Sequence, residues 1–328
     1  MDELILDCLL SDRGEEEMVR GASDYSRRHP DVLLDLFGTK ERMEKTLKEE
    51  GADLSRFRLY DSVPFDTSEA SSALSMMRDK RPNSIRDSMT YLRDHKEALG
   101  VLTAGPTGMV LVSVVSVLGM VEGVHFPALG ALLRNVKGRD VLLLDCGANL
   151  EVPPERLLSF ARIGEAFFRP LAKDGKPRVG LLNVGKEEGK GDSLRKKTYA
   201  LLKESGLNFV GNLEGSDLLL DKADVVVTDG FTGNALLKDT EATALIAEKM
   251  LLSVGGENEA FKKAASLIDE NFHYTLLGGS ILLGSRGLVV KAHGAGDRNT
   301  VVHCLDQVRR LGREKAVDAL EAALRTED

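Results

Sequence analysis

Cysteine, tryptophan and long apolar runs are scarce or missing in this 328-residue chain, which has three cysteines and no tryptophan. Cys8, Cys146 and Cys304 are widely spaced and form no CxxC pair, so the sequence indicates neither a zinc site nor a disulfide scaffold. The most apolar run, Met109–Val121, is shorter than the roughly 20 residues that a membrane-spanning helix requires. Positive charge is also in deficit. The net charge of −8 argues against nucleic acid as the main partner, but it allows a local basic cleft for an anionic substrate.

The start of the chain is acidic. Met1–Leu4 lacks the layout of a signal peptide, so we expect a cytoplasmic protein, with a peripheral contact at the inner membrane face left open.

Short apolar runs alternate with amphipathic stretches along the whole chain. The expected strands are Leu4–Leu6, Val32–Phe37, Ala98–Gly105, Val141–Asp145, Val179–Val184, Leu207–Val210, Ala223–Val227 and Leu288–Lys291. The expected helices are Glu15–Arg28, Glu41–Glu50, Ser84–His95, Pro106–Leu118, Pro153–Leu171, Ser193–Glu204, Gly233–Leu252, Glu259–Ile268 and Thr300–Thr326. The polar, Ser-rich segment Asp61–Asn83 is expected to form a surface loop with a short helix.

This alternation predicts an α/β fold with a largely parallel sheet covered by helices on both faces, a three-layer α/β/α arrangement. No long Pro/Ser linker divides the chain, so we expect one domain over residues 1–328, which could form two lobes around a cleft.

The stretch Ala223–Lys238 carries the clearest local signal. Its valine run predicts a buried strand, and Gly233 and Asn234 open a helical run after the turn that begins at Asp229. A strand that feeds a Gly-rich turn and a helix places free backbone N–H groups at the carboxyl end of a sheet, where anions bind. A plain βα connection with glycines that only permit a tight turn explains the pattern equally well.

Four turns of this form follow apolar strands. They are Thr103–Gly108, Asp145–Asn149, Asp229–Asn234 and Lys291–Asp297. If they share one rim of the sheet, they supply N–H groups, two amides, a lysine and a histidine, which suits a phosphate and a polarised carbonyl.

Most of the candidate site residues also have ordinary structural interpretations. Lys291 ends a strand and His293 follows it between small residues, but a solvated lysine and a hydrogen-bonded loop histidine fit as well. Asp145 and Asp229 each end a strand, where their carboxylates could bind a substrate or cap the next turn. Lys190, between glycines, could reach an anion.

Several common catalytic patterns are missing. Cys146 has no identifiable histidine partner and is interpreted as packing. No GxGxxG opens the chain, and neither GxxxxGK[ST] nor GxSxG occurs, which disfavours a nucleotide fold and a serine hydrolase. No helix carries histidines at metal-ligand spacing, so we expect no metal and no cofactor.

Five segments together resemble the PlsX family, the acyl-ACP:phosphate acyltransferases of bacterial phospholipid synthesis. They are Val141–Asn149 (VLLLDCGAN), Val179–Gly191 (VGLLNVGKEEGKG), Asn208–Gly215 (NFVGNLEG), Ala223–Lys238 (ADVVVTDGFTGNALLK) and Gly287–Gly294 (GLVVKAHG). The resemblance implies a Rossmann-like fold akin to isocitrate dehydrogenase and phosphate acetyltransferase. It also implies a homodimer, and a reaction of inorganic phosphate with a fatty acyl thioester on acyl carrier protein that gives acyl phosphate.

That chemistry needs positioning and electrostatic stabilisation rather than a covalent enzyme intermediate, because phosphate is the nucleophile and a thiolate leaves readily. We expect the phosphate to be held by Gly105, Thr107, Gly108, Lys238 and Lys291. The residues expected to orient or polarise the acyl group are Asn149, Asn234 and His293. The remaining substrate-binding candidates are Asp145, Lys190, Asp229, Gly233 and Gly294.

Apolar stripes occur near the expected long helix, at Leu245, Ile246, Met250, Leu251, Leu252, Phe261 and Leu267. They are typical of a core or a dimer interface, and the family's peripheral membrane association makes a bilayer contact a second interpretation.

The N-terminal half departs from the family at three places. The family's Asp-Ala-Met-Gly-Gly-Asp is here Asp7–Asp12, with Leu10 and Ser11 in place of the glycine pair. Pro106 replaces an asparagine and removes a backbone N–H, and Phe126 replaces an arginine. His125, Arg134 or the Arg78–Arg81 cluster would have to compensate, or activity is weak, altered or absent.

Two alternatives therefore accompany the phosphate acyltransferase. One is an acyl-phosphate-handling subunit for short acyl groups, like the PlsX-like component of glycine reductase. The other is a catalytically degenerate homologue that binds acyl carrier protein.

Overall fold

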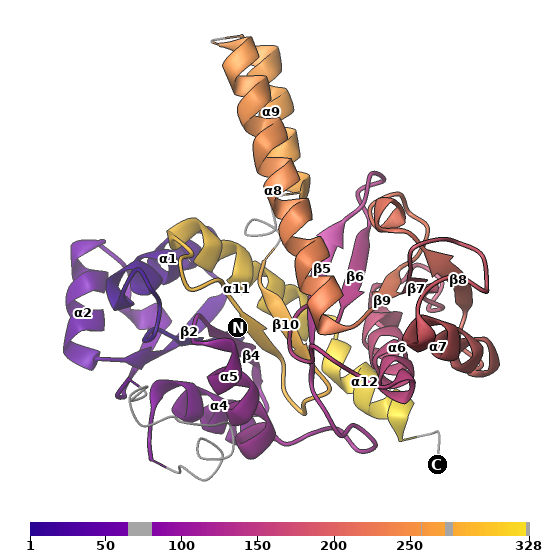
Figure 1. Ribbon diagram of the computed structural model, residues 1–328. Coiled ribbons are helices and arrows are strands. Elements are labelled where there is room, and N and C mark those ends of the chain that lie inside the picture. Colours follow the sequence, from indigo (N-terminus) through magenta and orange to yellow (C-terminus); the bar gives the residue numbers. More distant parts are fainter. Residues whose placement is uncertain (65–80, 257, 273–277, 326–328) are drawn as a thin grey trace. The chain divides into compact units, whose positions relative to one another are not determined.

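The computed structural model describes residues 1–64, 81–256, 258–272 and 278–325, and the chain folds as two compact units (Figure 1). Unit 1 comprises Met1–Pro127 and Gly284–Val317, and unit 2 comprises Ala128–Leu283 and Asp318–Asp328. Most of the expected surface segment Asp61–Asn83 lies outside the described residues, as does the Arg78–Arg81 cluster apart from Arg81.

The strands of unit 1 are all parallel and lie in the order β3-β2-β1-β4-β11. They are β1 (Asp2–Asp7), β2 (Val32–Gly38), β3 (Phe57–Asp61), β4 (Ala98–Thr103) and β11 (Val289–Lys291). Successive residues of β1 from Glu3 to Asp7 are buried. Since neighbouring residues of a strand point to opposite faces, both faces of this strand are covered.

The helices of unit 1 form two groups. They are α1 (Glu15–Arg28), α2 (Lys40–Glu49), α4 (Ser84–Asp94), α5 (Thr107–Ser113) and α11 (Arg298–Arg313). α1 packs against α2 and α11, while α4 packs against α5, and both groups contact the strands. A π-helical turn, Val114–Leu118, extends α5, and a short 3₁₀ turn, Leu54–Arg56, precedes β3.

The strands of unit 2 lie in the order β10-β5-β6-β9-β7-β8. They are β5 (Ala128–Arg134), β6 (Asp140–Leu144), β7 (Val179–Leu182), β8 (Phe209–Leu213), β9 (Val225–Val227) and β10 (Ser280–Leu283). β5 runs antiparallel to β6 and β10, and β6, β9, β7 and β8 are parallel. β6, β7 and β9 carry consecutive buried residues, as expected for strands covered on both faces.

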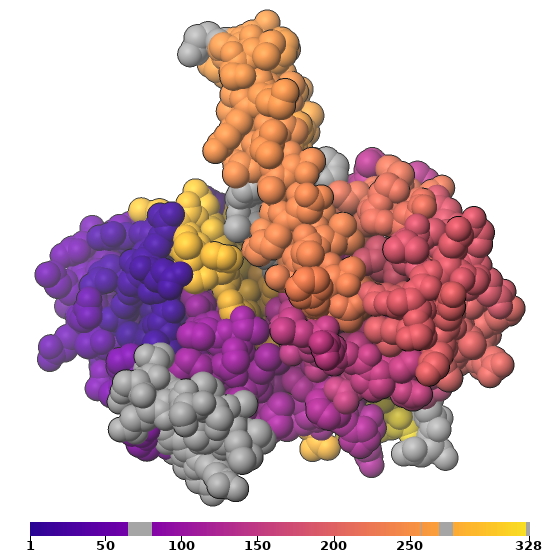
Figure 2. Space-filling view, in the orientation of Figure 1, coloured from indigo at the N-terminus to yellow at the C-terminus, as the bar shows by residue number. Residues whose placement is uncertain are grey.

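The helices of unit 2 include a long antiparallel pair. They are α6 (Pro154–Phe168), α7 (Ser193–Glu204), α8 (Gly230–Gly255) and α9 (Glu259–Phe272); α12 (Ala316–Leu324) follows α11 after Lys315. α8 and α9 lie side by side, and the end of α8 and the start of α9 lie far from the strands of unit 2 (Figure 1), where Figure 2 shows the pair projecting. This hairpin carries exposed apolar side chains, among them Ile246, Met250 and Val254 at 58%, 62% and 77% exposure. Within the described residues, no helix combines the length and apolarity that crossing a membrane requires.

The expected α/β alternation with mostly parallel strands is confirmed. Three strands were not predicted, namely β3, β5 and β10. The prediction of a single charged helix over Thr300–Thr326 was also wrong. The structure has two helices there, α11 and α12, which are separated at Lys315, where φ is +53°. The long helix starts at Gly230 rather than at Gly233.

Candidate functional site

The turn after β6 is built around the buried carboxylate of Asp145. Its Oδ1 accepts from the backbone N–H groups of Leu129, Gly147 and Ala148 at 3.0–3.1 Å. Its Oδ2 accepts from Asn149 N and Nδ2 at 2.7 and 2.8 Å. Burial raises the pKa of Asp145, although these hydrogen bonds act in the opposite direction. The N–H groups of this turn therefore serve Asp145 itself, and the capping interpretation of this residue is the one that the contacts support.

Asp229 caps the start of α8. Its carboxylate accepts from the backbone N–H of Thr232 at 2.9 Å, from the Thr232 hydroxyl and from the Arg195 guanidinium. The Arg195 side chain is 13% exposed and comes from the first turn of α7. Burial alone would raise the pKa of Asp229, but the hydrogen bonds from Thr232 and Arg195 hold it below its usual range. Asp229 is thus an N-cap whose carboxylate pairs with a partly buried guanidinium.

Two glycines let the start of α8 lie directly on the β6 turn. The N–H of Gly230 donates to the carbonyl of Asn149 at 2.8 Å. A Cβ added at Gly233 would lie 1.9 Å from the carbonyl oxygen of Asp145, closer than any real contact. Asn234 follows on the exposed side of the helix, next to Gly147. Unit 2 therefore brings the two predicted turns together, and close backbone approach explains their glycines.

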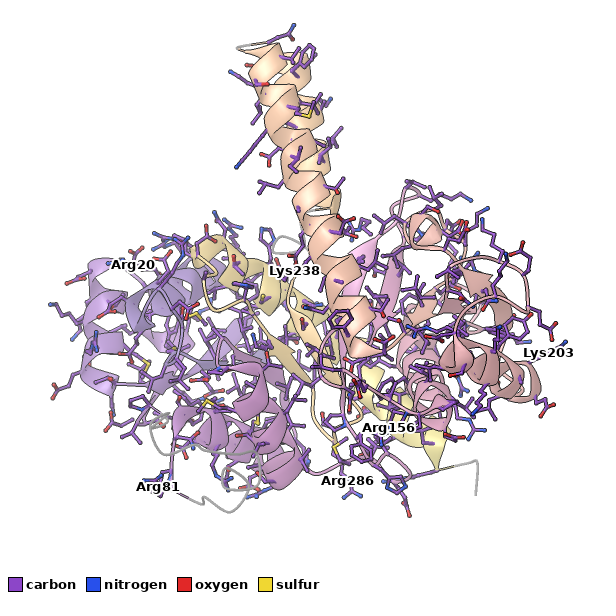
Figure 3. The ribbon with its side chains drawn as sticks, viewed as in Figure 1. Arg20, Arg81, Arg156, Lys203, Lys238 and Arg286 are labelled. Carbon is purple, nitrogen blue, oxygen red and sulfur yellow. The ribbon has the colours of Figure 1, made fainter. Side chains whose placement is uncertain are left out.

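The two candidate lysines of unit 2 are solvent-accessible. Lys238 lies on α8, one turn beyond Asn234, and its Nζ donates to Glu241 at 2.8 Å with its side chain 50% exposed (Figure 3). Lys190 is exposed in the loop after β7, where its carbonyl accepts from Asn183 Nδ2 at 3.1 Å.

In unit 1, the carboxyl ends of β1, β4 and β11 meet at Thr103. Its register partner is Lys291, and its carbonyl accepts from the N–H of Ala292 at 2.8 Å. Its hydroxyl donates to Asp7 Oδ2 at 2.7 Å and accepts from the N–H of Gly105 at 3.1 Å. Burial raises the pKa of Asp7 to about 6, against hydrogen bonds that lower it.

The turn after β11 packs against the altered N-terminal motif. The carbonyl of Gly294 accepts from Asp12 N at 2.9 Å and from Ser11 Oγ at 3.2 Å. The exposed His293 accepts from Ala295 N through Nδ1 at 3.2 Å. Leu10, where the family has a glycine, adopts a φ of +63°. The backbone here keeps the left-handed conformation that favours glycine.

The remaining anion candidates surround the start of α5. Pro106 precedes the helix with φ −58°, and Thr107 is its first residue. Gly105 is buried against Ile85, whereas a Cβ added at Gly108 would meet nothing within 4 Å.

Of the three proposed compensating groups, Arg134 pairs with Asp140 at 3.9 Å in unit 2 and His125 is exposed in unit 1.

Two residues were missed as candidates by the sequence reasoning. The sequence pointed to Asp7 only as the first residue of the altered N-terminal motif Asp7–Asp12, and its contact with Thr103 was not predicted. Arg195 gave no signal, because its partner Asp229 is 34 residues away along the chain.

The cysteines are confirmed as buried packing residues. Burial raises the pKa of Cys8 and Cys146 well above the usual thiol range and that of Cys304 to about 12. In the part of the chain that the structure describes, no group of three or more His, Cys, Asp or Glu residues is placed to hold a metal ion.

A sequence model of the family described as fatty acid synthesis protein matches residues 3–318. The chain belongs to this family. The resemblance to the PlsX family is thereby confirmed. The chain is similar to a phosphate acyltransferase of Syntrophomonas wolfei, 35% identical over 303 residues that cover 92% of each chain. A phosphate acyltransferase of Listeria monocytogenes is 34% identical over 328 residues, covering 98% of this chain and 96% of the relative.

Solved structures with the same fold include phosphotransacylases and 4-hydroxythreonine-4-phosphate dehydrogenases. The EutD phosphotransacetylase of Staphylococcus aureus superposes with a TM-score of 0.59 at 13% identity, over 97% of this chain and 94% of its own. A branched-chain phosphotransacylase of Enterococcus faecalis V583 gives 0.62 at 14% identity, over 95% and 99%. At these identities the likeness shows the fold alone.

Proposed function

We propose that this chain is a phosphate acyltransferase that converts an acyl thioester and inorganic phosphate to acyl phosphate and free thiol. The observation that carries the proposal is the 33–35% identity to proteins of that name over 92–98% of the chain. In the reaction, a phosphate oxygen attacks the thioester carbon, the new C–O bond forms, and the C–S bond breaks with release of the thiolate. The three buried cysteines fit a reaction in which no enzyme thiol takes part.

We propose two roles for the candidate residues of unit 2. Asp145, Asp229 and Gly233 are proposed as positioning residues, which is supported by the contacts of their polar atoms and backbone between the β6 turn and α8. We propose that Asn234, on the exposed face of the same turn of α8, orients or polarises the acyl group. Lys238, whose side chain is 50% exposed, is proposed to bind phosphate. Its ammonium group would leave the ion pair with Glu241 and pair with the phosphate instead.

The predicted roles of the other candidates stay proposals. The candidates for phosphate binding are Gly105, Thr107, Gly108, Lys190 and Lys291, and those for the acyl group are Asn149 and His293. Gly294 stays a candidate for substrate binding without a more specific role.

The natural thioester is proposed to be carried by acyl carrier protein, and the chain to act as a homodimer in the cytoplasm. The exposed apolar side chains of the α8–α9 hairpin support either a dimer interface or a peripheral bilayer contact. The likeness to the phosphotransacylases supports a three-layer, isocitrate-dehydrogenase-like arrangement for the chain.

The test is phosphate-dependent release of free thiol from palmitoyl-acyl carrier protein, with acyl phosphate measured as its hydroxamate. Turnover of acetyl thioesters alone would favour the short-chain subunit, and inert protein that still binds acyl carrier protein would favour the degenerate homologue. Lys238→Ala and Lys291→Ala should each raise the KM for phosphate. The matched control is Lys203→Ala, because Lys203 is also exposed and paired, with Glu188 at 3.1 Å (Figure 3). Equal effects of all three substitutions would remove Lys238 and Lys291 from the phosphate site.

A further inference from the structure

A pocket of about 700 Å³ lies within unit 2, between the end of β7, the loop into α7 and the first turns of α8. Carbon atoms make up most of its wall. Leu182 and Val184 line one side, and Ala235 and Leu236 line the other. Leu182 belongs to the buried core cluster of unit 2 and Leu236 packs against that cluster. Val184 is 80% exposed and Ala235 is exposed, so an apolar floor leads to an apolar, solvent-facing rim.

Three polar side chains of the wall already have hydrogen-bond or ion-pair partners, namely Asn183, Arg195 and Thr232. Asn183 accepts from Val184 N at 2.8 Å and donates to the Lys190 carbonyl at 3.1 Å. Arg195 is paired with Asp229 and, at 3.1 Å, with Asp192. A ligand therefore gains little from carrying polar groups into this space.

The charges of the wall disfavour an anion. Its one cation, Arg195, is neutralised by Asp229, and its two carboxylates, Asp192 and Asp239, are exposed. An anionic ligand would meet net negative charge. An uncharged chain of methylene groups fits both the carbon surface and the charge.

We propose that this pocket binds a linear alkyl chain, namely the acyl chain of the thioester substrate. The assignment rests on the proposed function, which supplies the acyl group. Its position along the chain is consistent with that role, because Ala235 directly follows Asn234 on α8. Covering Val184 and Ala235 with methylene groups removes exposed apolar surface from water, which is the driving force for binding.

Site-directed labelling tests the pocket independently of catalysis. Because all three native cysteines are buried, Ala235→Cys introduces the accessible thiol at the pocket wall. The probes are neutral alkyl methanethiosulfonates from methyl to octyl, at concentrations below saturation. Burial of each methylene in an apolar site strengthens binding by up to about fourfold. We therefore expect the labelling rate to rise at least tenfold from methyl to hexyl.

The matched control is Ala242→Cys, an exposed position farther along α8 that does not line the pocket, where the rate should not depend on chain length. Val184→Cys, on the opposite side of the pocket, is a second reporter that should follow Ala235→Cys. Circular dichroism identifies any variant that fails to fold. A flat chain-length profile at both pocket thiols overturns the proposal, as does a faster reaction with a pantetheine-derived thiosulfonate than with the hexyl reagent.

An activity measurement separates this inference from the proposed function. Ala235→Phe should lower kcat/KM for a 16-carbon thioester at least tenfold more than for a 4-carbon thioester, and Ala242→Phe should change neither. A wild-type protein that turns over no thioester refutes the proposed function, while the labelling profile still decides whether the pocket binds alkyl chains. An active wild type whose Ala235→Phe variant loses both substrates equally refutes the acyl-chain assignment alone.

Discussion

Replacing Asp221 by asparagine should destabilise unit 2, because this carboxylate gathers three cations. Its side chain is 3% exposed and accepts from Lys137 Nζ at 2.8 Å, from Arg178 Nη2 at 3.0 Å and from Arg139. Lys137 and Arg139 lie in the turn between β5 and β6, and Arg178 directly precedes β7. Asp221 has a φ of +60°, a conformation that asparagine also tolerates, so the substitution mainly removes the charge.

The magnitude follows from the pKa of Asp221. Burial would raise it, but the hydrogen bonds from Lys137, Arg178 and Arg139 lower it to about 2, from 3.8. That difference corresponds to about 2.4 kcal/mol of stabilisation at neutral pH. Lys137 is 66% exposed and Arg139 39%, so solvent screening reduces the contribution, and we expect about 1–2 kcal/mol.

The pH dependence has a definite sign. Because the folded pKa is depressed, the stabilisation is complete above about pH 4 and is lost as the pH falls through about 2. Urea unfolding at pH 7 should therefore show the full difference between wild type and Asp221→Asn, and the difference should shrink between pH 4 and 2. The control is Asp94→Asn, whose pair with Arg93 is exposed to solvent, so this substitution should leave the unfolding midpoint nearly unchanged. Equal unfolding midpoints for wild type and Asp221→Asn at pH 7 would refute the reasoning.

Three further substitutions test local features. Gly233→Ala should lower the free energy of unfolding by about 2–4 kcal/mol, because the added Cβ would overlap the Asp145 carbonyl. The control Gly108→Ala places its Cβ in open space and should be neutral or slightly stabilising. Equal thermal midpoints for the two variants would contradict the close contact at Gly233. Lys315→Gly should stabilise by up to about 1 kcal/mol in urea unfolding, since it relieves the φ of +53° between α11 and α12, and a loss of stability would count against this. Asp7 has a pKa of about 6, so the folded state binds a proton at this residue more readily than the unfolded chain does. Stability should therefore fall as the pH rises from about 4 to 6, and Asp7→Asn should flatten that decline. An unchanged pH profile of stability would exclude Asp7 as its source.

Local sequence patterns predicted those helices and strands that begin with capping or acidic residues or contain runs of β-branched residues. α1 and α7 have the predicted bounds, because acidic residues open α1 and Asp192 caps α7. β5, with the sequence ALGALLR, was missed since it has no β-branched residue and its leucines suit a helix equally well. β10 was missed because it is a short strand flanked by Gly278, Gly279 and Gly284, and the segment was interpreted as Gly-rich.

At the site, the turns were predicted but their contacts were not. Strand ends followed by glycine mark where a chain turns, and this located Asp145 and Asp229. The pairing of Asp229 with Arg195 depends on where the fold places the first turn of α7 relative to the start of α8, which no local pattern contains. Leu10 shows the opposite limit. Its residue type argues against a left-handed backbone, yet its φ is +63°.

The length of α8 has a mechanical consequence. Gly230–Gly255 is one uninterrupted helix of 26 residues, which at 1.5 Å per residue is about 39 Å long. Its first turn carries Asn234 and rests on the Asp145 turn, and its other end displays Met250 and Val254 to solvent. A partner surface that binds those two side chains would act on the same uninterrupted helix that carries Asn234. Tilting the far end of α8 would therefore also tilt its first turns.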